Sequence, residues 1–522
     1  MNERLREKHT EYIACSLDKK DLFEKVEAEF NQIEFENANG QFFSLKFSFY
    51  PDEDVIRWAV YRDFGIICPD SVFSLDEIET QWQEKYGNQD GSVIEQQIAF
   101  ASSPLVFFMS PRAIEKFKVS EKPMGWKTLL QLADSNVEFE LMHAKGLSNN
   151  GQPVALAQFI ATQANHNHSY LNELDDTALQ QVRALQQRVR EYGPSDSHVL
   201  RRAFKEGEWQ TDLVIAQERS ILQAATNTPS IRGTLIYPQE GTVWIDQSFS
   251  LMRHWENPKT QEVFQKLQRY LSSPNCDNFY TENKLHSKRS NQLGSKSEVE
   301  AFYKIQPSPI QQRIKRINYG AAPMVLPGRR VVRSINELWG NVEKPADVCL
   351  IVDVSGSMDA SAKIGLLKSG LSKFLQRFRS PQSTVGLVEF ESSAKVLAPL
   401  QLAVVNRFNL DGIITKLQPR GQTALLDAIH LGIQELELLG NPSHLQVIIA
   451  LTDGQENNSH ISLSQIQSRL TTQTGIRFYG IAYGQDADRS ILEKLANMTG
   501  GMVCSGAISD IEKIYKQLSQ YI

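Results

Sequence analysis

The sequence lacks the features that mark membrane, secreted or nucleic-acid-binding proteins. Its 522 residues contain no run of 18 apolar side chains, so no segment is expected to span a membrane. The formal net charge of −6 argues against general nucleic-acid binding. Residues 1–9 are charged and have no apolar core, unlike a secretory signal. We therefore expect a cytoplasmic protein. A misassigned start or a processed N-terminus would leave an extracytoplasmic location open.

Cysteines and enzyme motifs are also sparse. The five cysteines are scattered, and no two have the spacing of metal ligands: Cys15, Cys68, Cys276, Cys349 and Cys504. This odd number favours a reducing compartment. The chain has no Gly-Lys-Ser/Thr phosphate loop, no His-Glu-x-x-His and no Gly-x-Ser-x-Gly. With 41% apolar and 22% charged residues, the composition is that of a globular protein, and the length predicts two or three domains.

The most informative segment is an apolar run that ends in a carboxylate. Residues 348–352 are continuously apolar, which predicts a strand buried on both faces of a parallel sheet. Asp353 follows directly, and Ser355 and Ser357 come two and four residues later on a loop that contains Gly356. A buried carboxylate is costly unless a partner compensates it. One carboxylate and two hydroxyls around one point suit a hard cation such as Mg²⁺.

Two later segments contribute further oxygen atoms. Thr423 stands at the start of an apolar-periodic helix, and Asp453 follows a second buried strand, residues 447–451. Ligands bind beyond the carboxyl ends of parallel strands, so we expect these side chains to meet those around Asp353. In the alternative interpretation, Ser355 and Ser357 only cap the next helix and Asp453 only makes a turn.

This constellation resembles the metal-ion-dependent adhesion site (MIDAS) of von Willebrand factor A domains, and the resemblance covers residues 345–522. It implies an Mg²⁺ site, or one for Mn²⁺ or Ca²⁺, made by Asp353, Ser355, Ser357, Thr423 and Asp453. In the family, the hydroxyls contact the ion, the aspartates act directly or through water, and an acidic side chain of a partner protein completes the shell. Apolar periodicity agrees with this. It predicts helices at 364–378, 404–417, 424–439, 491–498 and 508–518, and strands at 385–390, 476–483 and 502–504. Such alternation is typical of a doubly wound, mostly parallel α/β sheet of Rossmann-like form.

The first 285 residues carry a second resemblance. Segments 12–22, 102–109, 122–130, 235–246 and 264–271 are similar, in this order, to the two-lobed α/β solute-binding proteins of bacteria, of periplasmic-binding-protein type II. The resemblance implies a solute held between two lobes. The matching positions for solute contacts are Ser16, Ser102, Ser103, Ser148 and Asn149. These residue types also suit turns and helix caps. Residues 286–344 contain several prolines and basic side chains, which predicts an exposed connector.

The sequence is compatible with three functions. The first is a non-enzymatic adaptor that binds an acidic protein partner through the metal of its A domain. By analogy alone, a MoxR-type AAA+ ATPase is such a partner. The second is small-solute or anion binding by the N-terminal domain in transport or sensing. The third is a phosphohydrolase. Chemistry with an aspartate nucleophile needs a second carboxylate two residues after Asp353, where Ser355 stands, so we expect no enzyme.

Overall fold

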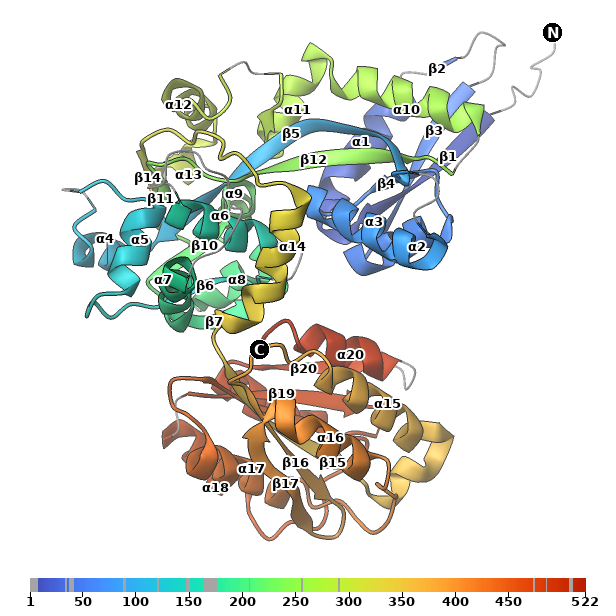
Figure 1. The fold of residues 1–522 in the computed structure, drawn as a ribbon, viewed down its shortest axis with the longest axis vertical. Coiled ribbons are helices and arrows are strands. Elements are labelled where there is room, and N and C mark those ends of the chain that lie inside the picture. The colour runs from blue at the N-terminus through green and yellow to red at the C-terminus, as the bar shows by residue number, and fades with distance from the viewer. Residues whose placement is uncertain are drawn as a thin grey trace. The chain divides into compact units, whose positions relative to one another are not determined.

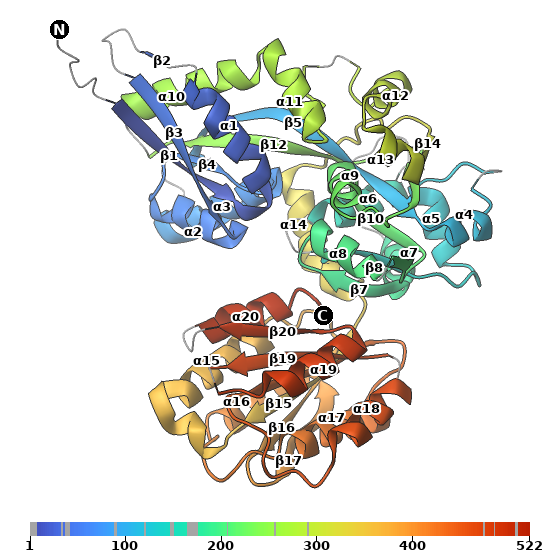
Figure 2. The same cartoon turned by 180° about the vertical axis from the view of Figure 1, so that it is seen from behind.

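In a computed structural model, the chain divides into two compact units. Figures 1 and 2 show the chain from opposite sides. The structure describes residues 8–32, 35–36, 42–87, 91–119, 122–146, 151–163, 176–205, 207–254, 257–289, 292–472, 475–484, 486–506 and 510–522. Unit 1 comprises residues 1–132, 139–173 and 195–335, and unit 2 comprises residues 133–138, 174–194 and 336–522. No described helix has the length and apolar character needed to cross a bilayer.

Unit 1 is built on a mixed sheet with helices. Its strands are β1 (Lys8–Ser16), β2 (Phe35–Glu36), β3 (Phe42–Tyr50), β4 (Ile66–Cys68), β5 (Ile94–Met109), β6 (Leu141–Ala144), β8 (Phe204–Lys205), β9 (Glu208–Trp209), β10 (Leu213–Gln217), β11 (Gly233–Tyr237), β12 (Trp244–Met252), β13 (His286–Ser287) and β14 (Ile314–Asn318). Its helices are η1 (Leu17–Lys19), α1 (Lys20–Gln32), α2 (Asp52–Tyr61), α3 (Val72–Tyr86), α4 (Pro111–Lys116), α5 (Trp126–Ala133), α6 (Gln152–Gln163), α8 (Asp196–Ala203), α9 (Glu218–Asn227), α10 (Pro258–Leu271), η2 (Pro274–Cys276), α11 (Asp277–Glu282), α12 (Lys296–Lys304) and α13 (Ser308–Arg313). Helix α14 (Arg329–Leu338) begins in this unit and crosses its boundary.

The long strand β5 belongs to two parts of this sheet. In the first part, the strand order is β2-β3-β1-β4-β12-β5, with β1 parallel to both β3 and β4. In the second part, the end of β5 pairs with β10 on one side and with β11 on the other, both antiparallel. The parts have separate cores. One contains Phe23, Phe47 and Phe249, and the other contains Phe108 and Tyr237.

The expected connector at 286–344 differs from what the structure shows. Most of it, through residue 335, belongs to unit 1, and β14 pairs in parallel with β11. Val299, Phe302 and Ile314 are buried in the core of the second part. Two of the basic side chains that suggested an exposed segment, Arg313 and Arg316, have internal partners. Arg313, for example, donates to the carbonyl oxygens of residues 225, 228 and 231. The charged sequence of β14 concealed a strand that lies at the edge of the sheet.

Unit 2 contains the doubly wound sheet. Its elements are α7 (Asp176–Gln187), β7 (Val189–Gly193), η3 (Trp339–Asn341), β15 (Ala346–Asp353), η4 (Gly356–Ala362), α15 (Lys363–Leu375), β16 (Thr384–Phe390), β17 (Ala394–Leu402), α16 (Ala403–Ile414), α17 (Leu425–Leu439), β18 (Leu445–Thr452), α18 (Leu463–Thr472), β19 (Ile476–Tyr483), α19 (Arg489–Thr499), β20 (Met502–Gly506) and α20 (Ile511–Leu518). The predicted helices and strands of residues 345–522 are confirmed, with ends shifted by a few residues. Strand β17 and helix α18 were not predicted.

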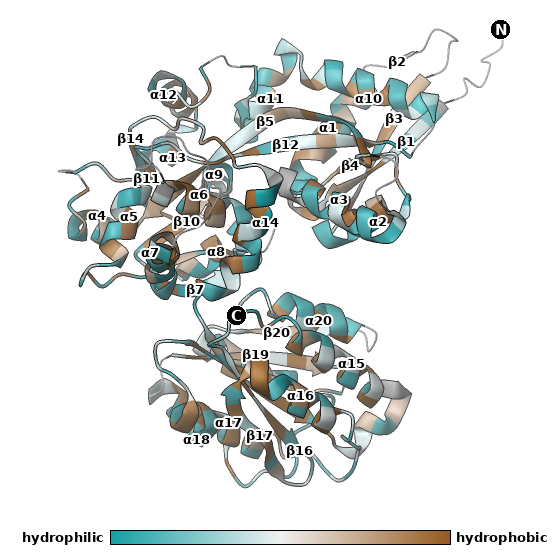
Figure 3. Ribbon diagram, in the orientation of Figure 1, coloured by the Kyte–Doolittle hydropathy of each residue, from teal (hydrophilic) through white to brown (hydrophobic). Residues whose placement is uncertain are grey.

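The strand order in this sheet is β17-β16-β15-β18-β19-β20. All neighbours are parallel except β17, which is antiparallel to β16 at one edge. Alternate residues of β15 point to opposite faces. Cys349 and Ile351 pack in a core with α17, α18 and α19, while α15 packs against α20 and α16. The helices of this unit show both hydrophilic and hydrophobic colouring in Figure 3, as amphipathic helices do.

A segment from earlier in the chain belongs to unit 2. The backbone N–H of Lys344 donates to the hydroxyl of Tyr192 at 2.9 Å, and its ammonium donates to the carbonyl oxygen of Val189 at 2.8 Å. Arg477 of β19 lies 3.7 Å from Glu191, measured from Nε to Oε2. Strand β7 is thus held to the residues that precede β15, although 152 residues separate Tyr192 from Lys344 in sequence.

A buried histidine between two carboxylates stabilises the second part of unit 1. His286 Nε2 lies 2.7 Å from Glu218 Oε2, and its Nδ1 lies 2.6 Å from Glu298 Oε1. Its ring stacks on Phe302, with 3.8 Å between centroids. Burial alone would lower the pKa of His286, but the two carboxylates outweigh burial and raise the pKa to about 9. The imidazolium is therefore the form that the folded protein prefers.

We expect unit 1 to lose stability as the pH rises. Because the folded pKa of His286 exceeds the usual 6.5, its contribution is complete below about pH 6.5 and is lost as the pH passes about 9. The loss is on the order of a few kcal/mol. Hydrogen exchange of the segment around β13, corrected for intrinsic rates at pH 6 and pH 9.5, measures it. His286→Gln should remove most of this pH dependence, while His460→Gln, a change at an exposed histidine of unit 2, should not. Equal pH dependence in both variants would contradict the assignment.

Candidate metal centre

The candidate site lies at the carboxyl ends of two neighbouring strands in unit 2. Strand β15 ends at Asp353 and β18 ends at Thr452, and the two strands are paired in parallel up to Val352 and Leu451. Helix α17 starts at Leu425, two residues after Thr423, and η4 follows Ser355. Each of these elements delivers a polar side chain to the same edge of the sheet. This is the edge at which ligands of doubly wound folds bind.

Asp353 is fully buried and anchors the site. Its Oδ1 accepts a hydrogen bond from the backbone N–H of Ser355 at 2.7 Å. Its Oδ2 accepts from the hydroxyl of Thr452 at 2.7 Å. The pKa of Asp353 is raised to about 6, chiefly by burial and to a smaller extent by the nearby Asp453 carboxylate, while these hydrogen bonds oppose the shift. The carboxylate thus occupies a position in which a neighbouring cation would stabilise its charged form.

Ser355, Ser357 and Asp453 form a continuous chain of hydrogen bonds. The hydroxyl oxygens of Ser355 and Ser357 are 2.9 Å apart, and Ser357 donates to Asp453 Oδ1 at 2.6 Å. The second oxygen of Asp453 accepts from the ammonium of Lys363, also at 2.6 Å. Asp453 is buried, whereas Ser357 is exposed, so the site opens to solvent on the side of Ser357.

Thr423 reaches the same place because residue 454 has no side chain. A Cβ on Gly454 would lie 3.2 Å from Thr423 Oγ1 and 3.7 Å from Ser357 Oγ. The missing Cβ therefore leaves a space that both hydroxyls border. The backbone N–H of Thr423 donates to Asn457 Oδ1 at 3.0 Å, which holds the loop before α17.

The five side chains predicted from the sequence thus lie together, and their role stays a prediction. They offer carboxylate and hydroxyl oxygens, the donor set that Mg²⁺ and Mn²⁺ take, so the residues present fit a divalent cation. Among the described residues, no group of three or more His, Cys, Asp and Glu side chains could hold a metal. A site here therefore depends on its hydroxyls, which add no charge of their own.

Sequence reasoning missed Lys363 and Thr452. Lys363 begins α15, and its position in sequence gives no sign that its ammonium reaches Asp453. Thr452 could have been found. It directly precedes Asp453, and the parallel register of β15 and β18 places it beside Asp353.

The predicted solute contacts in unit 1 are less clearly assembled. Ser16 ends β1 and precedes η1, and its side chain makes no cap hydrogen bond. Ser103 accepts from the backbone N–H of Arg219 at 3.0 Å, while the buried hydroxyl of Ser102 has no partner among the described residues. Strands β4 and β12 separate β1 from β5 in the sheet. Ser148 and Asn149 lie outside the described residues.

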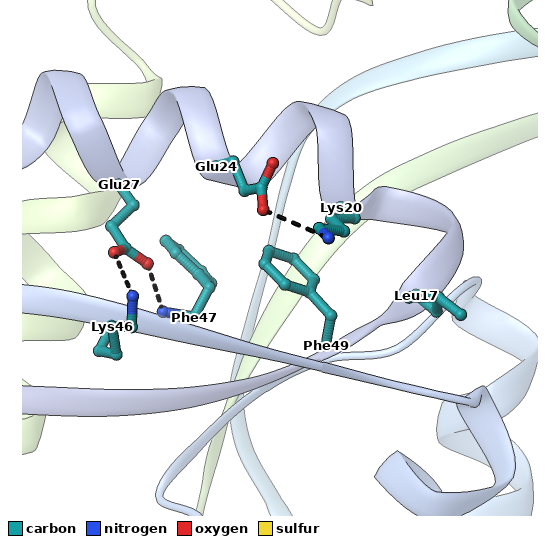
Figure 4. Close-up of a pocket in the computed structure, with 7 residues that line it drawn as sticks. All are labelled: Leu17, Lys20, Glu24, Glu27, Lys46, Phe47 and Phe49. Carbon is teal, nitrogen blue, oxygen red and sulfur yellow. Dashed lines mark hydrogen bonds and ion pairs between the residues drawn. The ribbon is translucent and has the colours of Figure 1, made fainter.

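A groove of about 460 Å³ lies elsewhere in unit 1, between α1 and β3. Figure 4 shows that its charged side chains pair with one another. Lys46 Nζ is 3.1 Å from Glu27 Oε1, and Lys20 Nζ is 3.7 Å from Glu24 Oε1. The groove is open and its charges are already neutralised, so we assign no ligand to it.

Comparison with known proteins identifies the second unit. Residues 347–517 match the family model of the von Willebrand factor type A domain, and a domain of this type occupies that part of the chain. The match covers the strands and loops that carry Asp353, Thr423 and Asp453.

Relatives are similar over this region. Calcium-activated chloride channel regulator 3A-1 of Mus musculus is 29% identical over 30% of this chain and 17% of its own length. Inter-alpha-trypsin inhibitor heavy chain H2 of Mus musculus is 27% identical over 34% of this chain and 20% of its own length. An uncharacterised protein of Synechocystis is 26% identical over 34% of this chain and 42% of its own length. The chain thus spans about a sixth of the length of the first relatives it matches.

Solved structures match over a similar share of this chain. A von Willebrand factor type A protein of Catenulispora acidiphila is 18% identical over 34% of this chain and 42% of that chain, with a TM-score of 0.31. Proximal thread matrix protein 1 of the mussel byssus is 21% identical over 43% of this chain and 56% of that chain, with a TM-score of 0.30.

We expect the Thr452→Val substitution to destabilise unit 2. Valine keeps the shape of threonine but removes the hydroxyl that donates to Asp353, and this leaves a buried carboxylate oxygen without that donor. The cost should be about 1–3 kcal/mol. Thermal denaturation in EDTA measures the loss. Thr471→Val, whose hydroxyl bonds only within its own helix on the surface, is the matched control and should change stability by less than about 0.5 kcal/mol. If the two variants melt alike, the buried hydrogen bond does not anchor Asp353.

Proposed function

We propose that the protein is a non-enzymatic adaptor that binds another protein through a divalent cation at the carboxyl edge of the unit 2 sheet. The cation is Mg²⁺, with Mn²⁺ or Ca²⁺ as substitutes. Ser355, Ser357 and Thr423 would hold it with their hydroxyls, and Asp353 and Asp453 would hold it directly or through water. The cation would supply an electrophilic point to which an acidic side chain of the partner binds.

The meeting of five oxygen-bearing side chains from separate segments carries this proposal. Asp353 and Asp453 together bring two negative charges, and Lys363 already neutralises part of the charge of Asp453. A divalent cation in such a site keeps net positive charge, because the remaining ligands are neutral hydroxyls. That residual charge favours a carboxylate from outside the chain. The solvent-facing position of Ser357 leaves room for it.

The matched relatives support an interaction role in a limited way. Their names describe a regulator of a chloride channel and a heavy chain of a protease inhibitor, and neither name describes an enzyme. Within unit 2, the described residues around Asp353 include two serines, two threonines and a lysine but no carboxylate at position 355 that would assist an aspartate nucleophile. A MoxR-type AAA+ ATPase stays an analogy for the partner.

Binding of Mg²⁺ is the first test. We expect one site per chain by calorimetry and an increase of about 2.7 kcal/mol in the free energy of unfolding of unit 2 at a hundredfold excess over the dissociation constant. Asp353→Ala should abolish both effects. The matched control is Asp411→Ala, a change at a part-buried aspartate whose partner is Ser372 on α15, and it should leave Mg²⁺ binding intact. A wild-type protein that shows no response to Mg²⁺, Mn²⁺ or Ca²⁺ would refute the metal site.

Lys363 gives the second test. Its ammonium holds Asp453 Oδ2 at 2.6 Å and so competes with a cation for that carboxylate. Lys363→Met should therefore lower the dissociation constant for Mg²⁺, by roughly tenfold for each 1.4 kcal/mol of relieved competition. Lys368→Met is the control, because Lys368 lies on the same helix and donates only to the carbonyl oxygen of Thr415. Weaker binding by Lys363→Met would show that the lysine assists the site instead of competing for it.

Partner binding is the third test. Protein captured from an extract of the source cells on the immobilised full chain should be retained in Mg²⁺ and released by EDTA. Thr423→Ala should weaken capture, because it removes one of the five oxygen atoms, while its melting temperature in EDTA should stay close to that of the wild type. Thr415→Ala, on the surface at the end of α16, is the control. Capture that ignores both EDTA and Thr423→Ala would exclude a metal-bridged contact.

Small-solute binding by unit 1 is a second candidate function. It follows from the proposed likeness of this unit to bacterial solute-binding proteins. The buried hydroxyl of Ser102, which has no partner among the described residues, favours it. A solute that raises the melting temperature of the wild type but not of Ser102→Ala would support this function. If it is the main activity, Ser102→Ala abolishes function and Thr423→Ala does not.

A further inference from the structure

Two cysteines of unit 1 face each other on neighbouring strands. In the parallel pair β1 and β4, Cys15 is aligned with Cys68, so both side chains point to the same face of the sheet. Aligned residues on paired strands have Cα atoms about 4.8 Å apart. Disulfides accept Cα separations of about 4.4–6.8 Å. Both thiols are fully buried in one core.

A buried lysine lies beside this pair. Lys19 ends η1, only 1% of its surface is exposed, and its ammonium donates to Cys68 Sγ at 3.9 Å. In the part of the chain that the structure describes, no carboxylate lies within ion-pairing distance of this ammonium. A buried, unpaired ammonium is costly. Ionisation of Cys68 would offset that cost, because it gives Lys19 an anionic partner.

The two thiols are accordingly unequal. Burial raises the pKa of Cys15 well above its usual value. Burial also acts to raise the pKa of Cys68, but the hydrogen bond from Cys15 and the charge of Lys19 outweigh it, and the pKa of Cys68 is lowered. The thiol of Cys68 also donates to the carbonyl oxygen of Ser248 at 3.1 Å in its neutral form. A thiolate with a neighbouring protonated thiol is the arrangement of an attacking and a resolving cysteine.

The remaining cysteines lack this arrangement. Cys276 donates to the carbonyl oxygen of Tyr270, and burial raises its pKa. Burial also raises the pKa of Cys349 and Cys504, and neither has a lysine or a second thiol among its described contacts. The pairing of two thiols with a buried lysine therefore sets Cys15 and Cys68 apart.

We propose that Cys15 and Cys68 are a reversible oxidation site, in which Cys68 reacts with hydrogen peroxide and Cys15 then closes a disulfide. The Cys68 thiolate attacks one peroxide oxygen, the O–O bond breaks, and the departing hydroxide takes a proton to become water. Cys68 is then a sulfenic acid. The sulfur of Cys15 attacks it, the S–O bond breaks, and the hydroxyl leaves as a second water with the proton of Cys15. Two thiols lose two electrons and two protons in all, and one peroxide becomes two waters.

The buried position sets the rate and the consequence of this reaction. Peroxide is little larger than water and enters through local opening of the strand ends. The disulfide consumes the thiolate, so oxidation leaves the ammonium of Lys19 buried without an anion. We therefore expect η1 and the start of α1 to open more often in the oxidised protein. Reduction by a dithiol would restore the original state.

The test uses the full chain and hydrogen peroxide. Peptide mapping without reductant should find a Cys15–Cys68 crosslink, with loss of two hydrogen atoms, which dithiothreitol reverses. Cys15→Ser should instead accumulate a sulfenic acid at Cys68 that dimedone traps. Lys19→Met, similar in length but uncharged, should slow crosslinking by about tenfold or more. Cys276→Ser, a control in the same unit, should react as the wild type does.

Hydrogen exchange tests the predicted consequence without any variant. Residues 17–22 should exchange faster in the oxidised than in the reduced wild type, and β16 in unit 2 should not change. An oxidised wild type without the Cys15–Cys68 crosslink would overturn the proposal, even if variants fail to fold. So would a Lys19→Met protein that folds and crosslinks at the wild-type rate.

Discussion

The buried carboxylate of Asp353 is the constraint around which unit 2 is organised. A negative charge at the end of a strand that is buried on both faces is unfavourable in isolation. The protein compensates for it with the backbone N–H of Ser355 and the hydroxyl of Thr452, which come from the following loop and from the neighbouring strand. Those two contacts fix the loop that carries Ser355 and Ser357 relative to β18. They also place Asp453, the next residue after Thr452, beside the same point.

The neutral hydroxyl ligands and the competing ammonium of Lys363 then determine what such a site can do. If all the oxygen atoms belonged to carboxylates, a bound cation would be fully neutralised and would attract nothing further. Here, three of the five side chains are neutral hydroxyls, and Lys363 already balances part of the charge of Asp453. Lys363 and the open side of the site have opposite effects. The lysine opposes binding of a metal cation, whereas the open side at Ser357 favours binding of a ligand from solvent. Under the proposed function, these opposing effects would favour an interaction that forms and dissociates.

The sequence predicted unit 2 well because its signals are local. Continuous apolar runs such as residues 348–352 indicate central parallel strands, and helical periodicity located α15, α17 and α19. Edge elements gave weaker signals. Strand β17 contains Pro399, a residue that is confined to edge strands, and its positions range from exposed to buried. Strand β14 is charged and has no apolar run. The contacts of Lys363, Lys19 and His286 depend on residues far away in the sequence, and no local pattern reports them. The same limit explains why the basic residues of 286–344 were expected to be exposed, although Arg313 and Arg316 donate to internal carbonyl oxygens.

The interleaving of the two units in sequence bears on how the chain is made. Residues 174–194 belong to unit 2, but they lie between two stretches of unit 1. During synthesis, Tyr192 leaves the ribosome well before Lys344, its partner 152 residues later. At rates of about 5–20 residues per second, that delay is on the order of ten seconds or more. During this time Tyr192 and Val189 lack their contacts with Lys344. The order of synthesis therefore delays the completion of unit 2 until its last long stretch, residues 336–522, is being made.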